Sequence, residues 1–162
     1  MVIKDDSNFR HFHQETNYSC GAAAARQLLH FVGINKDEPT IRNLVKTTKS
    51  GTATCAVFDF LRKNLPTKEI AILDVYADFE SQIRWLNNLS KTNIIYCSGD
   101  FVCGHKRRGR PSERLHAFCI FQSKIYDPGE QTVFPIDCFG HTYDKKLKIN
   151  HLILVHTGGY LT

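Results

Sequence analysis

The apolar residues of this chain change their spacing after residue 91, and that change constrains the fold more than any other feature. Before it, apolar residues recur mostly at helical spacing; after it, they occur in short runs typical of β-strands. A chain in which helices come first and strands follow suits an α+β domain with N-terminal helices packed on a C-terminal antiparallel sheet. Its 162 residues predict one domain spanning 1–162.

The expected elements follow from this spacing and from turn-forming residues. The first helix runs from Ser19 or Cys20 to about Phe31 and ends at Gly33. Thr54 is expected to cap a later helix. The other predicted helices are 40–46, the one from 54 to the residue before Pro66, and 78–91; the predicted strands are 69–76, 93–97, 115–121, 123–127, 132–136 and 151–155.

Composition excludes several classes of protein. The N-terminal segment lacks the apolar core of a signal peptide, and no apolar run is long enough to span a membrane. Six cysteines are present, but their spacing is not that of a disulfide framework, because Cys55 lies in a helix-like run and Cys97 and Cys119 lie in strand-like runs. We therefore expect a soluble, cytoplasmic protein with mostly free thiols.

Cys20 is the candidate nucleophile. It stands at the expected start of a helix, just ahead of Gly21 and four alanines. A thiol attacks as the thiolate, which a helix N-terminus and a neighbouring histidine both favour. Gly21 would let the backbone come close to a substrate. A buried, inert cysteine is the alternative for Cys20.

His116 and Asp127 are the candidate partners of this thiol. His116 lies in one strand-like run and Asp127 ends the next, so a hairpin would place them side by side. The carboxylate could then hold the imidazole ring in the required orientation. The side chain of Gln14 and the backbone N–H of Cys20 are candidate donors to an oxyanion.

These residues resemble a known signature. Gln14, five intervening residues and Cys20-Gly21-Ala22 resemble the papain-like cysteine peptidases that remove double-glycine leader peptides from bacteriocins. The histidine strand and the following strand that ends in Asp127-Pro128 are also similar to that family, in order and spacing. The resemblance implies a papain-like fold, a bacterial or phage origin, and a Cys20–His116–Asp127 triad with Gln14 as oxyanion donor, acting without a cofactor on a peptide or protein substrate.

The sequence does not identify the bond that is cut. The leader peptidases usually form part of an ATP-driven exporter and often carry aspartate where this chain has Ser19. We expect a stand-alone domain here, and the same centre could act as a glutamine deamidase or as another amide or thioester hydrolase. Such an enzyme could also be an effector delivered to another cell.

The basic segment 103–114 supports a different hypothesis about function. Residues 108–111, with the sequence Arg-Gly-Arg-Pro, match the core of the AT-hook, a short basic motif that binds DNA. The net charge of +5 also permits an acidic partner. The chain could be a nucleic-acid-binding protein, or a catalytically idle interaction module that uses residues 106–114. Alternatively, the segment borders the catalytic site and selects an acidic or phosphate-bearing substrate. The residues expected to contact such a substrate are Arg107, Arg108 and Arg110.

Three residues could suggest a zinc site. Cys97, Cys103 and His105 lie close together in the sequence, but their spacing is not that of a zinc finger. No metal is therefore predicted.

Overall fold

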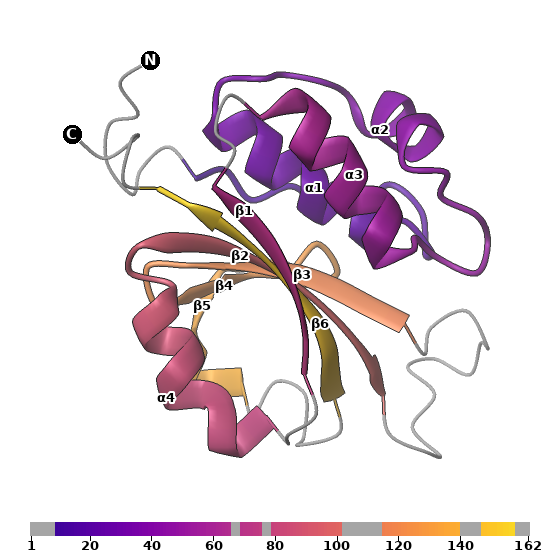
Figure 1. Ribbon diagram of the computed structural model, residues 1–162. Helices are drawn as coiled ribbons and strands as arrows, with labels where there is room; N and C mark the ends of the chain where they lie inside the picture. Colours follow the sequence, from indigo (N-terminus) through magenta and orange to yellow (C-terminus); the bar gives the residue numbers. More distant parts are fainter. Residues whose placement is uncertain (1–8, 66–68, 76–78, 102–114, 140–146, 158–162) are drawn as a thin grey trace.

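The computed structural model describes residues 9–65, 69–75, 79–101, 115–139 and 147–157. In it, three helices cover one face of a twisted sheet and a fourth lies against the opposite face (Figure 1). The helices are α1 (Cys20–Phe31), α2 (Glu38–Leu44), α3 (Thr54–Asn64) and α4 (Phe79–Leu89), with a short 3-10 helix η4 (Ile136–Cys138). The strands are β1 (Ile70–Asp74), β2 (Asn93–Phe101), β3 (Leu115–Phe121), β4 (Lys124–Tyr126), β5 (Phe134–Pro135) and β6 (Leu147–His156).

All six strands join one sheet in the order β1-β6-β2-β3-β4-β5, and every neighbouring pair is antiparallel. The predicted α+β class, with N-terminal helices on an antiparallel sheet, is confirmed. The longest pairing, between β2 and β6, shifts its register between Ser98 and Gly99. A side chain at Gly99 would collide with the backbone of Lys148, so this bulge requires glycine.

The sheet separates two cores. The larger one, between the sheet and α1–α3, is formed by residues that include Ala24, Leu28 and Tyr96. The second lies on the other face, where Leu86 of α4 packs with residues such as Phe118. Because side chains alternate along a strand, β3 serves both cores.

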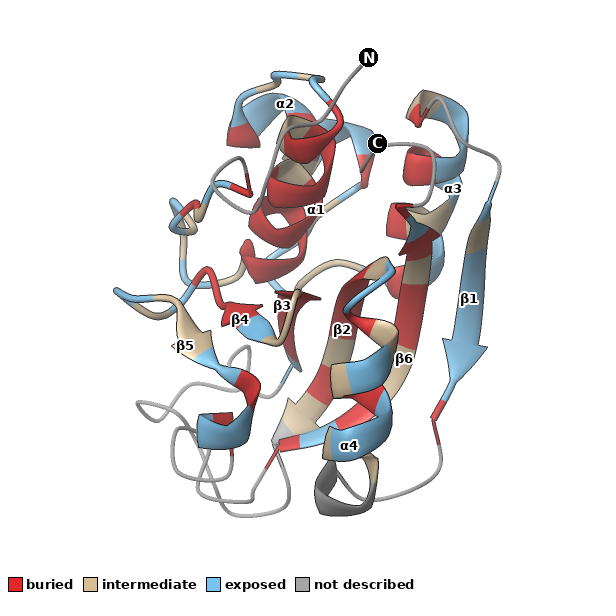
Figure 2. Cartoon of the chain, turned by 90° about the vertical axis from the view of Figure 1, so that its left-hand side faces the viewer, coloured by how far each residue is buried: buried red, intermediate tan, exposed pale blue. Residues whose placement is uncertain are grey.

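Helix α1 is the central helix, and it is buried along almost its whole length (Figure 2). Its alanines, Ala22 to Ala25, are completely buried, and the thiol of Cys119 in β3 donates to the carbonyl of Ala24 at 3.2 Å. Small side chains allow this close approach of helix to sheet. The helix ends in a Schellman motif, in which the N–H of Gly33 bonds to His30 and that of Ile34 to Leu29; Gly33 has a φ of 85°.

The start of one helix and the cap of another differ from the predictions. Helix α2 begins at Glu38 rather than Thr40, because the Asp37 side chain accepts the N–H of Thr40 at 2.9 Å and caps the helix earlier. Helix α3 begins at Thr54 itself, and Ala53 occupies the N-cap position without a side-chain bond. The prediction that Thr54 caps this helix is wrong.

The five cysteines that the structure describes are free. Among the described residues, no helix is long and apolar enough to cross a membrane.

The hydroxyl of Tyr96 provides a test of the core. Tyr96 is completely buried, and within the described part of the chain its Oη has no hydrogen-bond partner. A buried hydroxyl without a partner costs free energy. We expect Tyr96→Phe, which keeps the ring, to raise the free energy of unfolding by about 1 kcal/mol. Thermal denaturation should show a melting temperature higher by about 2–4 °C. A lower melting temperature would contradict the unpaired state of this hydroxyl.

Candidate active site

Cys20 is the first residue of α1, and only 9% of it is exposed. The first N–H groups of a helix have no partner within the helix, so they favour negative charge at this end. The next residue, Gly21, is closely covered by the protein itself. A β-carbon added there would lie 2.8 Å from the β-carbon of Thr52 and 3.0 Å from the hydroxyl of Tyr96. Packing alone therefore requires glycine at this position.

His116 and Asp127 meet through the hairpin of β3 and β4. The strands pair Cys119 with Tyr126 and Phe121 with Lys124, so Asp127 directly follows β4 beside the part of β3 that precedes Cys119. Nε2 of His116 lies 2.6 Å from Oδ2 of Asp127, and both side chains are almost completely buried. The predicted proximity of these two residues is thus present in the structure.

The surroundings of His116 favour its charged form. Burial disfavours a charged ring and lowers the pKa of His116. The negative charge and hydrogen bond of Asp127, with smaller effects of a hydrogen bond to Cys20 and its charge, outweigh burial and raise the pKa from 6.5 to about 10. Because Asp127 holds Nε2, Nδ1 is the ring nitrogen left for Cys20. Cys20, His116 and Asp127 thus form a connected group.

The other core thiols lie in different surroundings. Burial raises the pKa of Cys97 well above its ordinary value and that of Cys119 to about 12, although a hydrogen bond from Gln27 opposes the shift at Cys119. A buried thiol with a raised pKa is a poor nucleophile. The position of Cys20 beside His116 therefore distinguishes it from these two cysteines.

Asp127 is held by its own segment and by α1. Its second carboxylate oxygen, Oδ1, accepts the N–H of Gly129 at 2.7 Å. The carbonyl of the preceding residue, Tyr126, accepts a bond of 3.0 Å from the buried side chain of Gln27. Gln27 also accepts the N–H of Phe12, so one side chain of α1 connects the N-terminal segment to β4.

Gln14 lies on the segment that leads into α1. Its backbone N–H donates to the carbonyl of Pro128 at 3.0 Å, which brings the segment against the residue after Asp127. Its side-chain amide donates to the carbonyl of Thr16 at 2.7 Å. The amide nitrogen carries a second hydrogen, so this bond leaves one hydrogen for another acceptor.

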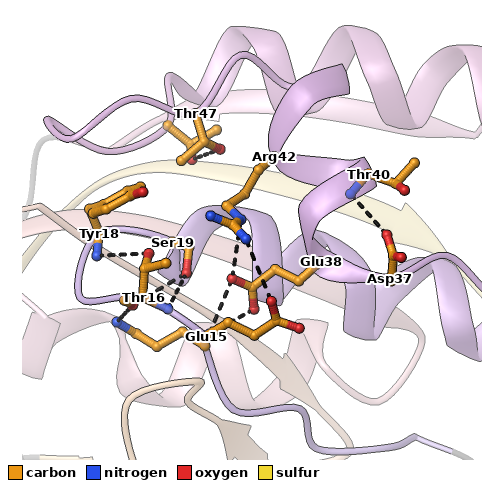
Figure 3. Close-up of polar contacts among 11 residues, drawn as sticks. Glu15, Thr16, Tyr18, Ser19, Asp37, Glu38, Thr40, Arg42 and Thr47 are labelled. Atoms are coloured by element: carbon orange, nitrogen blue, oxygen red, sulfur yellow. Dashed lines mark hydrogen bonds and ion pairs between the residues drawn. The ribbon is translucent and has the colours of Figure 1, made fainter.

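Side chains of α2 hold the turn from Glu15 to Ser19 (Figure 3). The carboxylate of Glu38, which is completely buried, accepts the N–H of Glu15 at 3.0 and 3.1 Å. Arg42 lies 3.7 Å from Glu38 and 3.5 Å from the carboxylate of Glu15. Burial raises the pKa of Glu38, and hydrogen bonds from Ser19 and Glu15 oppose this shift. The buried carboxylate thus acts as the anchor of the turn that joins Gln14 to Cys20.

Sequence reasoning did not find Gln27 or Glu38. A glutamine within the apolar face of α1 was the only signal for Gln27, and nothing in the sequence marks Glu38 as buried. Arg107, Arg108 and Arg110 lie outside the described residues, as do Cys103 and His105 of the zinc hypothesis. In the described ranges, no group of three His, Cys, Asp or Glu side chains is placed to hold a metal ion.

Comparison with solved structures identifies the fold. No protein-family model matches the sequence, and no curated protein matches it. The structure is similar to the peptidase domain of Streptococcus ComA, a bi-functional ABC transporter involved in a quorum-sensing pathway, with a TM-score of 0.60 and 17% identity over 91% of this chain and 98% of that one. It is also similar to a double-glycine motif protease from an AMS/PCAT transporter in complex with its leader peptide, with a TM-score of 0.60 and 14% identity over 96% and 97% of the two chains. The chain therefore has the papain-like fold of double-glycine peptidase domains, as the sequence resemblance predicted.

Proposed function

We propose that this chain is one catalytic domain that hydrolyses a peptide or protein substrate as a cysteine peptidase. The observation that carries the proposal is the buried 2.6 Å contact between His116 and Asp127 beside Cys20 at the start of α1. The similarity in fold to peptidase domains supports it. Free thiols suit a reducing compartment such as the cytoplasm.

The reaction begins with the Cys20 thiolate, which attacks the carbonyl carbon of the scissile bond. Protonated His116 then gives its proton to the leaving amine as the carbon–nitrogen bond breaks and a thioester to Cys20 forms. His116 next removes a proton from water as the water oxygen attacks the thioester. The carbon–sulfur bond then breaks, which releases the acid product and regenerates the Cys20 thiolate beside protonated His116. Asp127 keeps the ring oriented and stabilises its charged form through both steps.

The oxyanion of the tetrahedral intermediate needs preorganised donors. The backbone N–H of Cys20 is one donor, because it belongs to the first turn of α1. The remaining amide hydrogen of Gln14 is the second, and the bonds of this residue to Pro128 and Thr16 support its fixed position. Gly21 keeps the backbone beside the nucleophile compact.

The same centre would also hydrolyse a glutamine side-chain amide, so deamidation is the alternative reaction. The products distinguish the two activities. A peptidase creates new chain ends, whereas a deamidase releases ammonia and leaves the substrate chain whole. Capture of substrates on Cys20→Ala, followed by mass spectrometry of products made by the wild-type protein, separates them.

The triad predicts unequal thiol reactivity. We expect iodoacetamide to modify Cys20 faster than the exposed Cys55 near neutral pH, because His116 favours the thiolate. His116→Ala should slow modification of Cys20 only, and either Cys20→Ala or His116→Ala should lower hydrolysis by about 10³-fold or more. Peptide mass spectrometry measures the modification of each cysteine separately. Cys55→Ser is the matched control, and we expect it to hydrolyse the substrate at the wild-type rate. Equal rates of iodoacetamide modification at Cys20 and Cys55 would instead indicate a catalytically idle interaction module.

The raised pKa of His116 predicts an alkaline limit of activity. His116 must be protonated to supply the leaving group, so kcat/KM should fall as the pH rises through about 10. The same pairing stabilises the fold in full below pH 6.5, and this contribution is lost as the pH rises through about 10. Asp127→Asn keeps an acceptor but removes the charge, so we expect the limit to move down by about 1–3 pH units. An unchanged limit would contradict the role of Asp127.

The basic segment gives a further prediction about the substrate. We propose that Arg107, Arg108 and Arg110 bind an acidic or phosphate-bearing substrate rather than nucleic acid. The triple replacement by alanine should raise KM and weaken its salt dependence, while iodoacetamide modifies Cys20 at the wild-type rate. Substrate affinity equal to that of the wild-type protein would overturn this assignment. Salt-dependent binding to AT-rich duplex, lost in the same variant, would instead support nucleic-acid binding.

A further inference from the structure

Three consecutive carbonyls around Asp127 accept hydrogen bonds from the N-terminal part of the chain. Tyr126 accepts from Gln27 at 3.0 Å, and Pro128 accepts from the backbone of Gln14 at 3.0 Å. The central carbonyl, that of Asp127 itself, accepts from Nε2 of His11 at 2.6 Å. The shortest of the three bonds therefore falls on the residue that holds His116.

The segment that carries His11 is firmly attached to the core. The ring of Phe9 lies 4.4 Å from the ring of Tyr126 and 5.3 Å from that of Phe121. The guanidinium of Arg26 lies 4.0 Å from the ring centre of Phe12. Because residues on both sides of His11 are anchored, its imidazole has little freedom to leave the Asp127 carbonyl.

The side chain and backbone of Asp127 are thus fixed from different directions. Oδ2 contacts His116, and Oδ1 accepts the N–H of Gly129 from the local turn. Rotation of the 127–128 backbone would move the carboxylate away from His116. Two donors on the Asp127 carbonyl oppose this rotation. The N–H of Glu130, at 3.1 Å, belongs to the turn itself, and Nε2 of His11, at 2.6 Å, adds a hold from the N-terminal segment.

We propose that His11 is a positioning residue of the catalytic site, which acts by holding the Asp127 carbonyl and so keeping the Asp127 carboxylate on His116. The inference rests on the proposed peptidase function for its biological meaning, but the positioning itself can be measured without any substrate. His11 must carry its proton on Nε2 to donate this bond. The charges of Asp127 and Cys20 act on His116, and the ring centre of His13 lies 4.8 Å from that of His11.

The test is a pH titration of His116 in the full chain, in which NMR signals of the imidazole C–H groups report its protonation. In His11→Phe, which keeps a ring but lacks the donor, we expect the His116 midpoint to fall by about one pH unit, because the carboxylate is less well placed. His11→Gln offers an amide donor and should restore most of the shift. His13→Phe changes the adjacent exposed histidine and should titrate as the wild-type protein does.

A purely structural role predicts another result. In that case His11→Phe would lower the melting temperature and leave the His116 midpoint unchanged, and this outcome would overturn the proposal. Should His11→Phe fail to fold, the tautomer of His11 in the wild-type protein, read from its nitrogen chemical shifts, decides the matter. A neutral His11 with its proton on Nδ1 cannot donate from Nε2 and would equally refute the proposal. A shifted His116 in a protein that hydrolyses no peptide would refute the peptidase function and leave the role of His11 intact.

Discussion

The close packing of α1 on the sheet is the constraint on which the rest of the structure depends. Four consecutive alanines are completely buried, and the thiol of Cys119 reaches the backbone of α1 at Ala24. Larger side chains at these positions would push the helix outward, since a protein interior has little spare volume. The first residue of the same helix is Cys20, so the packing that builds the core also brings the thiol to His116.

Hydrogen bonds then hold the segments around the site in place. The N-terminal segment and α1 bind the backbone on both sides of Asp127, and the buried Glu38 binds the turn that leads into Cys20. A buried carboxylate or amide is stable only when it is hydrogen-bonded, so each of these groups is locked to a partner. The site is therefore supported by residues that themselves perform no chemistry.

Much of the fold could be predicted from local patterns. The extent of α1, from Cys20 to the stop at Gly33, follows from its alanine run and its terminal glycine, and the structure agrees. The start of α2 could not be placed, because its cap, Asp37, lies in a polar stretch with several possible starts. The exposed strand β1 shows that a run of apolar residues can predict a strand without predicting that its side chains are buried. Its residues 71–74 are apolar or acidic and all exposed, because it lies at the sheet edge.

By itself, the sequence determined the order of helices and strands and the residue types that can carry a thiol reaction, since both depend on local spacing and chemical identity. It also placed His116 and Asp127 in neighbouring runs that a hairpin joins. Only the tertiary structure decided which distant groups support them. His11 and Asp127 are 116 residues apart in the chain, and Gln27 and Tyr126 are 99 apart. No local pattern encodes such pairs, because the packing of α1 and the N-terminal segment against the sheet creates them.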